Sequence, residues 1–365
     1  MAQGVIADNW SLQDISSLFL EGLDKEKAGE ITIDENQHSY KPISIAVTQT
    51  EALFDFITDL VLRDEILVDE KFSDAWDAMD SPILNAKKLG VVRAYPFLSK
   101  SDEISEIREE ISDRICSTKS LRVAHKENVD GWNFNKESPH QLLSQTLWGG
   151  AGMCARSYVY EKSYTPHPLR KRLFINSGFM LPADDAVHQV SNFLNDQKVK
   201  VSGKLLGNDK LFSTYINIPA IPIRILQESQ SAEQMISIAL QMRDDFQALR
   251  DWLKMFQNAI SEEDTKTMIK YRKELDSVSQ YIDKKIGYGT STNPVSMEAG
   301  VGIFKVAIKG NPLDSLKNQF GIRATLNKLI LGSSGREEIR KYVKMFGVDG
   351  SATAYEIENS FIVKG

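Results

Sequence analysis

The sequence has 365 residues, of which 42% are hydrophobic and 26% are charged, an ordinary composition for a soluble globular protein and not that of a disordered chain. This length allows two or three packing units, because a single core stops growing at a few hundred residues. Two cysteines exclude a disulfide scaffold and an all-cysteine zinc site, and a pI near 5.6 argues against a dominant basic nucleic-acid surface.

The N-terminal segment carries no basic stretch leading into an apolar run, so the sequence predicts neither a secretory signal nor a transit peptide. The longest central stretch without Asp, Glu, Lys or Arg is residues 138–155. It contains His140, two glutamines and three glycines, and is too polar to span a membrane. We therefore expect a cytoplasmic protein that does not bind a membrane.

Charge is distributed unevenly along the chain. Residues 1–120 carry a net charge of −12, and the remaining residues carry +6. Opposite signs on two parts of one chain favour their docking on each other, or a bipolar surface that orients a partner.

The acidic N-terminal third contains three predicted helices and two predicted strands. Thr48 stands three residues before Glu51 in a capping-box arrangement, and Ser101 caps a run of isoleucines at helical spacing. Apolar side chains alternate with polar ones in the two strand candidates. The predicted order is helix 10–23, strands 31–33 and 43–47, helix 49–62 and helix 100–116.

The central part begins with a predicted helix over 139–162. Three glycines inside it, at 149, 150 and 152, indicate a break or a backbone pressed close to a neighbour, because glycine costs about 1 kcal/mol in a helix interior. The prolines in Tyr164–Arg170 predict an extended segment there. Asp184 and Asp185 open a further helix. A β-hairpin is then expected over 198–216, and Pro219 and Pro222 predict an extended lead into the next helix.

The most regular pattern of the chain lies between residues 231 and 286. Apolar residues from Met235 to Ile260 recur at steps of four and three, and a second series from Met268 to Ile282 is out of phase with them. The change of phase falls at Ser261, whose hydroxyl can cap a new helix. The pattern predicts a long antiparallel helical hairpin.

A linker follows Gly287, then a strand candidate at 301–308 and a last helix that opens near Ser334. The sequence thus predicts an α+β fold that is predominantly α-helical with short strands. Its predicted parts are an acidic α+β unit (1–120), a central helix, Pro-rich loop and β-hairpin (121–228), the helical hairpin (229–288) and a C-terminal strand and helix region (289–365).

A basic segment is the best candidate for a ligand site. From residue 156 to 172 there are five basic side chains against Glu161 alone. Arginine matches phosphate or carboxylate oxygens with a fork of donors, so these residues could converge on an anionic small molecule or a nucleic acid. The alternative, which we favour at this point, is a cationic helix end that neutralises the acidic N-terminal third. The candidate ligand-binding residues are Arg156, Tyr160, Tyr164, His167, Arg170 and Arg172.

An acidic segment is a second candidate. Residues 51–80 hold ten carboxylates and two cations, and Asp69 ends an apolar run, so a magnesium site is conceivable there. The favoured alternative is a solvated face, because Asp55 and Asp59 fall opposite the apolar stripe of their helix. The five histidines have no zinc-ligand spacing, and no phosphate-binding loop is found, so we predict neither a metal nor a cofactor.

Other residues support weaker hypotheses. Cys154 would make a nucleophile only with a histidine beside it, and a small core residue is the favoured alternative. Aromatic and methionine side chains in the predicted helical hairpin could instead bind a partner, because such residues are enriched at interfaces. The interaction candidates are Phe246, Trp252, Met255 and Phe256.

Two hypotheses of function follow. The first is a non-catalytic interaction or regulatory subunit that associates with a protein partner, or with itself, through the helical hairpin. The second is an enzyme or sensor that binds a phosphorylated ligand or nucleic acid through the basic segment. The sequence favours the first, and resembles no family with a known activity.

Overall fold

The computed structural model describes residues 4–22, 27–33, 38–70, 73, 83–127, 138, 140–179, 185–206, 220–286, 322–326 and 329. The chain divides into two compact units. Unit 1 comprises Met1–Asp184, Glu228–Gln241 and Glu356–Gly365, and unit 2 comprises Asp185–Gln227 and Met242–Tyr355. The four-part organisation expected from the sequence stays a prediction.

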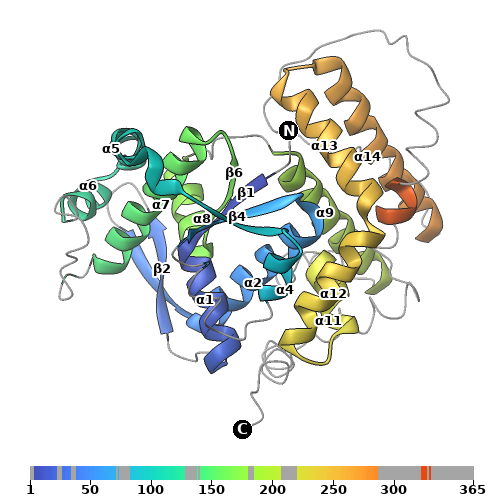
Figure 1. Ribbon diagram of the computed structural model, residues 1–365, viewed down its shortest axis with the longest axis horizontal. Coiled ribbons are helices and arrows are strands. Elements are labelled where there is room, and N and C mark those ends of the chain that lie inside the picture. The colour runs from blue at the N-terminus through green and yellow to red at the C-terminus, as the bar shows by residue number, and fades with distance from the viewer. Residues whose placement is uncertain are drawn as a thin grey trace. The chain divides into compact units, whose positions relative to one another are not determined.

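Unit 1 is built on a parallel sheet of four short strands, of which β1, β4 and β6 are labelled in Figure 1. The strands are β1 (Gly4–Ala7), β4 (Glu65–Asp69), β5 (Val92–Tyr95) and β6 (Ser163–Thr165), in the spatial order β5-β4-β1-β6. β1 pairs in parallel with both β4 and β6, and it is buried along its whole length. The chain therefore leaves β1 toward β4 on one side and returns to β6 on the other.

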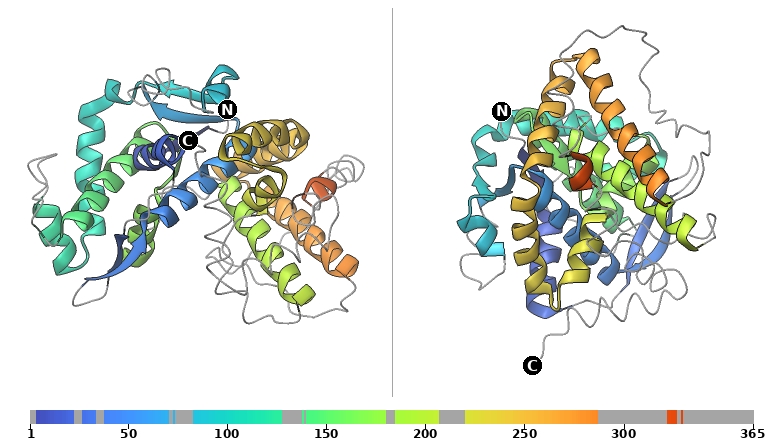
Figure 2. Two further views of the ribbon diagram at one scale, coloured as in Figure 1. Left: turned by 90° about the horizontal axis from the view of Figure 1, so that it is seen from below. Right: turned by 90° about the vertical axis from the view of Figure 1, so that its right-hand side faces the viewer.

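The remaining elements of unit 1 surround this sheet. A separate antiparallel pair, β2 (Lys27–Ile33) and β3 (His38–Ser44), stands apart from it in Figures 1 and 2. The helices are α1 (Asn9–Glu21), α2 (Ile45–Leu62), α4 (Ile83–Lys88), the 3-10 turn η1 (Phe97–Lys100), α5 (Ser101–Ile115), α6 (Lys119–Lys126), α7 (Gln141–Val159) and α8 (Pro168–Ser177).

One face of the sheet is covered by α7, on which α5 and α6 pack in turn. Ile6 and Leu67 point from the strands into this core, where they meet Leu147, Ala151 and other apolar residues of α7. Burial of such side chains is the main stabilising term for the unit.

The glycines of α7 do not break the helix. A Cβ added at Gly149 would lie 2.8 Å from Cζ of Arg170, and one added at Gly150 would lie 3.0 Å from Phe174. The close-approach explanation is therefore confirmed at these two positions: the glycines let α8 side chains lie directly on the α7 backbone. Gly152 has only an ordinary contact at 3.6 Å.

Unit 2 contains α9 (Ala186–Leu206), α11 (Ala220–Glu228), α13 (Gln247–Ser261) and α14 (Thr265–Ile286), and the boundary with unit 1 falls inside α12 (Ala232–Asp245). α9 packs against both α13 and α14. With the small sheet of unit 1, this content confirms a mainly α-helical α+β protein. Among the described residues, no helix has both the length and the hydrophobicity needed to span a membrane.

Several local expectations are wrong. Residues 198–206 belong to α9 and not to a β-hairpin arm, so the alternation of lysines and valines there does not indicate a strand, and the second arm at 207–216 lies outside the described residues. Pro222 lies in the first turn of α11, where its missing N–H costs nothing. Ile45 starts α2 instead of ending a strand, and α8 already begins at Pro168.

The region from 231 to 286 forms three helices where two were expected. The first apolar series does not lie on one helix, because α12 ends at Asp245 and Phe246 interrupts it with φ −109° and ψ 21°. α13 and α14 follow with a three-residue turn between them and pack on each other. The strand candidate at 301–308 and the last helix near Ser334 lie outside the described residues.

Removing one hydrogen bond tests the packing of α13 on α14. Trp252 is buried, its ring meets Tyr271 edge-on at 5.1 Å, and its Nε1–H donates to Glu274 at 2.6 Å. In Trp252→Phe, Glu274 loses this donor while buried, so we expect a loss of about 1–3 kcal/mol in the free energy of unfolding, measured by urea denaturation. Met255→Ala, at a side chain that is 40% exposed, should cost less than about 0.5 kcal/mol. Equal losses for the two variants would contradict the prediction.

Candidate functional site

The carboxyl edge of the parallel sheet gathers polar residues from four strands. Asp8 follows β1, Asp69 ends β4, the 3-10 turn η1 follows β5, and Thr165 ends β6. In open parallel sheets, ligands bind outside the carboxyl ends of the strands, at the point where the strand order reverses. Here that point lies between β1 and β6.

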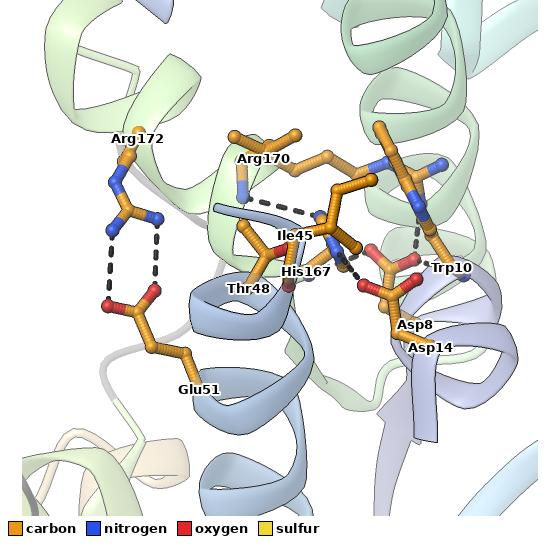
Figure 3. Close-up of polar contacts among 10 residues, drawn as sticks. Asp8, Trp10, Asp14, Ile45, Thr48, Glu51, His167, Arg170 and Arg172 are labelled. Atoms are coloured by element: carbon orange, nitrogen blue, oxygen red, sulfur yellow. Dashed lines mark hydrogen bonds and ion pairs between the residues drawn. The ribbon is translucent and has the colours of Figure 1, made fainter. Parts of the chain in front are cut away.

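Asp8 is the centre of this edge, and Figure 3 shows its surroundings. Its Oδ1 accepts hydrogen bonds from the backbone N–H of Trp10, at 2.8 Å, and from Nη1 of Arg170. Its Oδ2 accepts from the hydroxyl of Tyr164 and from the backbone N–H of His167, at 3.0 Å. Four donors saturate a carboxylate that is 0% exposed, so Asp8 fixes structure and has no free lone pair for chemistry.

Electrostatics agree with a permanently ionised Asp8. Burial opposes ionisation, but the charge of Arg170 and the donated hydrogen bonds outweigh it and hold the pKa of Asp8 below its ordinary value. The same contact raises the pKa of Arg170 despite its burial. Burial and the neighbouring Asp8 charge raise the pKa of Tyr164 well above its ordinary value, so its hydroxyl remains a donor.

His167 caps α8 instead of facing a ligand. Its Nδ1 accepts from the backbone N–H of Leu169 at 3.3 Å, so the ring proton lies on Nε2, which donates to Asp14 at 3.1 Å. The ring is fully buried and stacks on the indole of Trp10, with centroids 4.3 Å apart and planes within 1°. Both nitrogens are occupied, so His167 is not poised to act as a general base.

The acidic face of α2 is only partly solvated, because Asp55 is 27% exposed whereas Asp59 is buried, and this corrects the expectation for Asp59. Asp59 is buried, accepts from Thr165 Oγ1 at 2.6 Å and pairs with Arg63 at 3.2 Å. Asp55 faces Lys171 of α8 at 3.9 Å. This face of α2 docks on β6 and α8, and burial raises the pKa of Asp59 to about 6.

The predicted basic residues divide among several partners. Tyr164, His167 and Arg170 meet at Asp8 and Asp14, whereas Arg172 forms two bonds with Glu51 at 3.0 and 3.1 Å. Within the described residues, six side chains of the segment from 156 to 172 pair with the acidic N-terminal third, as the neutralising alternative expects. The pairs are Arg156–Asp69, Lys162–Glu65, His167–Asp14, Arg170–Asp8, Lys171–Asp55 and Arg172–Glu51.

Arg156 differs from the other arginines of this segment. A guanidinium has five N–H donors, yet within the described residues its polar contacts are an ion pair with Asp69 at 3.5 Å and a sulfur contact with Met153 at 3.4 Å. The side chain is 18% exposed and lies over the Phe97 ring at 5.2 Å. Burial lowers the pKa of Arg156, and Asp69 opposes this shift. It is a half-buried cation at the carboxyl edge whose donors are mostly unmatched.

Tyr160 lies beside Arg156 and holds the 3-10 turn. Its hydroxyl is 3.3 and 3.2 Å from the carbonyl oxygens of Pro96 and Phe97 and 3.0 Å from Ser99 Oγ. Because the Tyr160 proton goes to a carbonyl, Ser99 is the donor of the third contact. Tyr160 thus belongs to the β5 side of the carboxyl edge and does not contact Asp8.

Neither cysteine is suited to nucleophilic chemistry. Cys154 is buried, and burial raises the pKa of its thiol far above the ordinary value. Burial likewise raises the pKa of Cys116 to about 11. Across the parts of the chain that the structure describes, no three His, Cys, Asp or Glu side chains are grouped so that they could hold a metal ion.

The interaction candidates lie mostly inside the protein. Phe246, Trp252 and Phe256 are each about 1% exposed, and Met255 alone of the four is accessible. These aromatic rings pack within the chain, so they cannot bind a partner without local unfolding.

Sequence reasoning missed Asp8 and Asp14. A short buried run, Gly4–Ala7, followed by an aspartate before a helical pattern is the signature of a strand that leads into a helix. That signal would have placed Asp8 at a strand end, where ligand-binding residues of parallel sheets gather. No family model, curated protein or solved structure matches the chain.

The Asp8 network predicts a large loss of stability in Asp8→Asn. The variant leaves the Arg170 charge buried without a counter-charge, which costs about 3–5 kcal/mol when one partner of a buried pair is removed. Urea denaturation at pH 7 measures the loss. Asp113→Asn, at an exposed aspartate of α5, should change the free energy of unfolding by less than about 0.5 kcal/mol. A loss below 1 kcal/mol in Asp8→Asn would show that Arg170 does not depend on Asp8.

Asp59 predicts a pH dependence of the opposite sign to that of Asp8. Its pKa rises from 3.8 to about 6 on folding, so the folded protein holds a proton that the unfolded chain releases. Its contribution to stability therefore falls as pH rises from about 4 to 6. Urea titrations of the parent and of Asp59→Asn at pH 4, 5, 6 and 7 give the difference between their free energies of unfolding. We expect this difference, parent minus variant, to decrease across this window. A constant or rising difference contradicts the assignment.

Proposed function

We propose that unit 1 is an enzyme or sensor domain that binds a phosphate-bearing ligand at the carboxyl edge of its parallel sheet, with Arg156 as the principal contact. The observation that carries the proposal is the unmatched guanidinium of Arg156, which is half-buried yet accessible. The Arg156 donors that have no partner among the described residues are open to solvent, so they are available to an external acceptor. Phosphate oxygens match an arginine fork well.

The position of Arg156 supports the same proposal. Its partner Asp69 is the last residue of β4, which neighbours β1, so Arg156 lies at the carboxyl edge, one strand away from the point between β1 and β6 where the strand order reverses. Asp8, Arg170 and Tyr164 are near enough to influence its charge state. Asp8 and Arg170 are paired with each other, and this pair fixes the carboxyl edge of the sheet. Arg156 is not part of that pair, so it can exchange its partner for a ligand.

A ligand phosphate would compete with Asp69 for Arg156. The 3.5 Å pair is longer than the 3.0 and 3.1 Å bonds that join Arg172 to Glu51. Partly exposed ion pairs contribute about 1 kcal/mol or less, whereas hydrogen bonds to a charged group contribute about 1.5–3 kcal/mol. Exchange of the Asp69 carboxylate for a ligand phosphate is therefore favourable for Arg156. The Asp69 carboxylate weakens phosphate binding but does not prevent it.

Association through the helical segment 231–286 stays a prediction. Three of its four candidate residues are buried within the chain, so this structure offers little surface for it. We favour ligand binding by unit 1 for this reason.

Isothermal titration with inorganic pyrophosphate tests the proposal. Arg156→Ala should weaken binding by about 10- to 100-fold, which corresponds to the loss of charge-assisted hydrogen bonds. Asp69→Asn should strengthen binding by about 5-fold, because it removes a competing charge worth roughly 1 kcal/mol. If the Arg156–Asp69 pair has only a structural role, Asp69→Asn should not strengthen pyrophosphate binding.

Arg93→Ala is the matched control. Arg93 is an exposed arginine of β5 that pairs with Glu65 at 3.3 Å, so its removal changes the net charge equally and spares the site. Its pyrophosphate affinity should stay within about twofold of the parent at moderate salt. The proposal is wrong if the parent binds no pyrophosphate at millimolar concentration, or if Arg93→Ala and Arg156→Ala weaken binding equally.

A further inference from the structure

We infer that the phosphate-bearing ligand also carries a nucleobase, which is received by the aromatic side chains beside Arg156. This inference rests on the proposed function and adds the chemical class of the ligand. The aromatic cluster comprises Tyr95, Phe97 and Tyr160, at the carboxyl end of β5 and in the turn that follows α7.

The three rings pack on one another at the carboxyl edge. Ring centroids of Tyr95 and Tyr160 are 5.0 Å apart at 86°, and those of Phe97 and Tyr160 are 5.5 Å apart at 70°. Phe97 is buried below them, whereas Tyr95 and Tyr160 remain partly exposed. Partly exposed aromatic rings on a firm base are the surfaces on which nucleobases stack.

The turn beside the rings is held in place before any ligand arrives. The Tyr160 hydroxyl contacts the carbonyl oxygens of Pro96 and Phe97 and the hydroxyl of Ser99. Leu98, between Phe97 and Ser99 in this turn, is 76% exposed, so an apolar side chain faces water next to the aromatic cluster. Preorganised, partly apolar surface reduces the entropy that a flat ligand would lose on binding.

Cations flank the rings on two sides. Arg156 lies over Phe97 at 5.2 Å, and Lys100 lies over Tyr160 at 5.5 Å while pairing with Glu103 at 3.6 Å. A phosphorylated sugar would use the cations and gain nothing from the rings. A nucleotide uses both, because its base is joined to its phosphate through a single sugar. The same chemistry is offered by a free nucleotide and by an unpaired nucleotide of a single strand.

The test compares phosphate-bearing ligands with and without a nucleobase on the full chain by isothermal titration. The probes are inorganic pyrophosphate, the four common ribonucleoside diphosphates and a short single-stranded oligonucleotide. We expect at least one nucleoside diphosphate to bind about 10-fold tighter than pyrophosphate, because stacking on aromatic side chains contributes a factor of this order. This comparison needs no variant, so it stands whether or not a substituted chain folds.

Substitutions then assign the effect to the aromatic cluster. Tyr160→Leu should remove the preference for the nucleoside diphosphate and leave pyrophosphate binding within about twofold, whereas Tyr160→Phe, which keeps the ring, should retain most of it. Tyr158→Leu, at an exposed tyrosine of the same helix, is the control and should change neither. A preference that survives in Tyr160→Leu overturns the assignment.

The outcomes separate this inference from the proposed function. If pyrophosphate binds and no nucleoside diphosphate binds better, the nucleobase inference is overturned and the phosphate site stands. If neither binds, both are overturned. If the oligonucleotide binds more tightly than the nucleoside diphosphates, with a steeper dependence on salt, the inference stands and the ligand is an unpaired nucleotide of a single strand. If a nucleoside diphosphate binds more tightly than the oligonucleotide, the inference stands and the ligand is a free nucleotide.

Discussion

The carboxylate of Asp8 is the constraint on which the rest of unit 1 depends. A charge removed from water is tolerated only when its lone pairs are filled, and here four donors fill them, from Trp10, Tyr164, His167 and Arg170. Three of these donors lie more than 150 residues away along the chain. One buried side chain thus joins the ends of β1 and β6 to the starts of α1 and α8, and fixes the edge beside which Arg156 lies.

The segregation of charge along the sequence has a structural cause. The acidic N-terminal third contributes β1, β4 and α2, and the basic segment contributes β6 and α8, which pack directly against them. Among the described residues, five ion pairs and the hydrogen bond from His167 to Asp14 join the two regions, so most of the basic side chains are committed to structure. This is why a basic cluster in the sequence does not become a basic surface. Among the three arginines of this segment, Arg156 has the longest ion pair, at 3.5 Å, and this loose pairing is the basis of the proposed ligand contact.

Helices with strong periodicity could be predicted, and the sheet could not. The isoleucines of α5 and the apolar spacing of α7 determine their helices locally, and the docking of acidic on basic regions follows from charge. β1 and β6 have four and three residues, too few to show alternation, so a parallel sheet leaves almost no local pattern. The acidic face of α2 resembled a solvated one because a helix with Asp55 and Asp59 opposite its apolar stripe looks the same whether water or α8 covers them. Convergence at Asp8 and the aromatic cluster depends on contacts between distant segments, which spacing does not encode.

Asp69 sets the affinity of the proposed site. An arginine with no counter-charge at 18% exposure would stay under-solvated in the free protein, and its burial would destabilise the fold. A carboxylate at 3.5 Å reduces this cost but is too distant to form the paired bonds that bind Arg172 to Glu51. A ligand must therefore displace a weak internal partner, which selects for anions with several oxygens, such as phosphates, over monatomic anions such as chloride, since only the former can use more than one donor of the fork. Tyr95 and Tyr160 are partly exposed and pack on Phe97 beside the same guanidinium, so the inferred site favours ligands that join a phosphate to a flat ring.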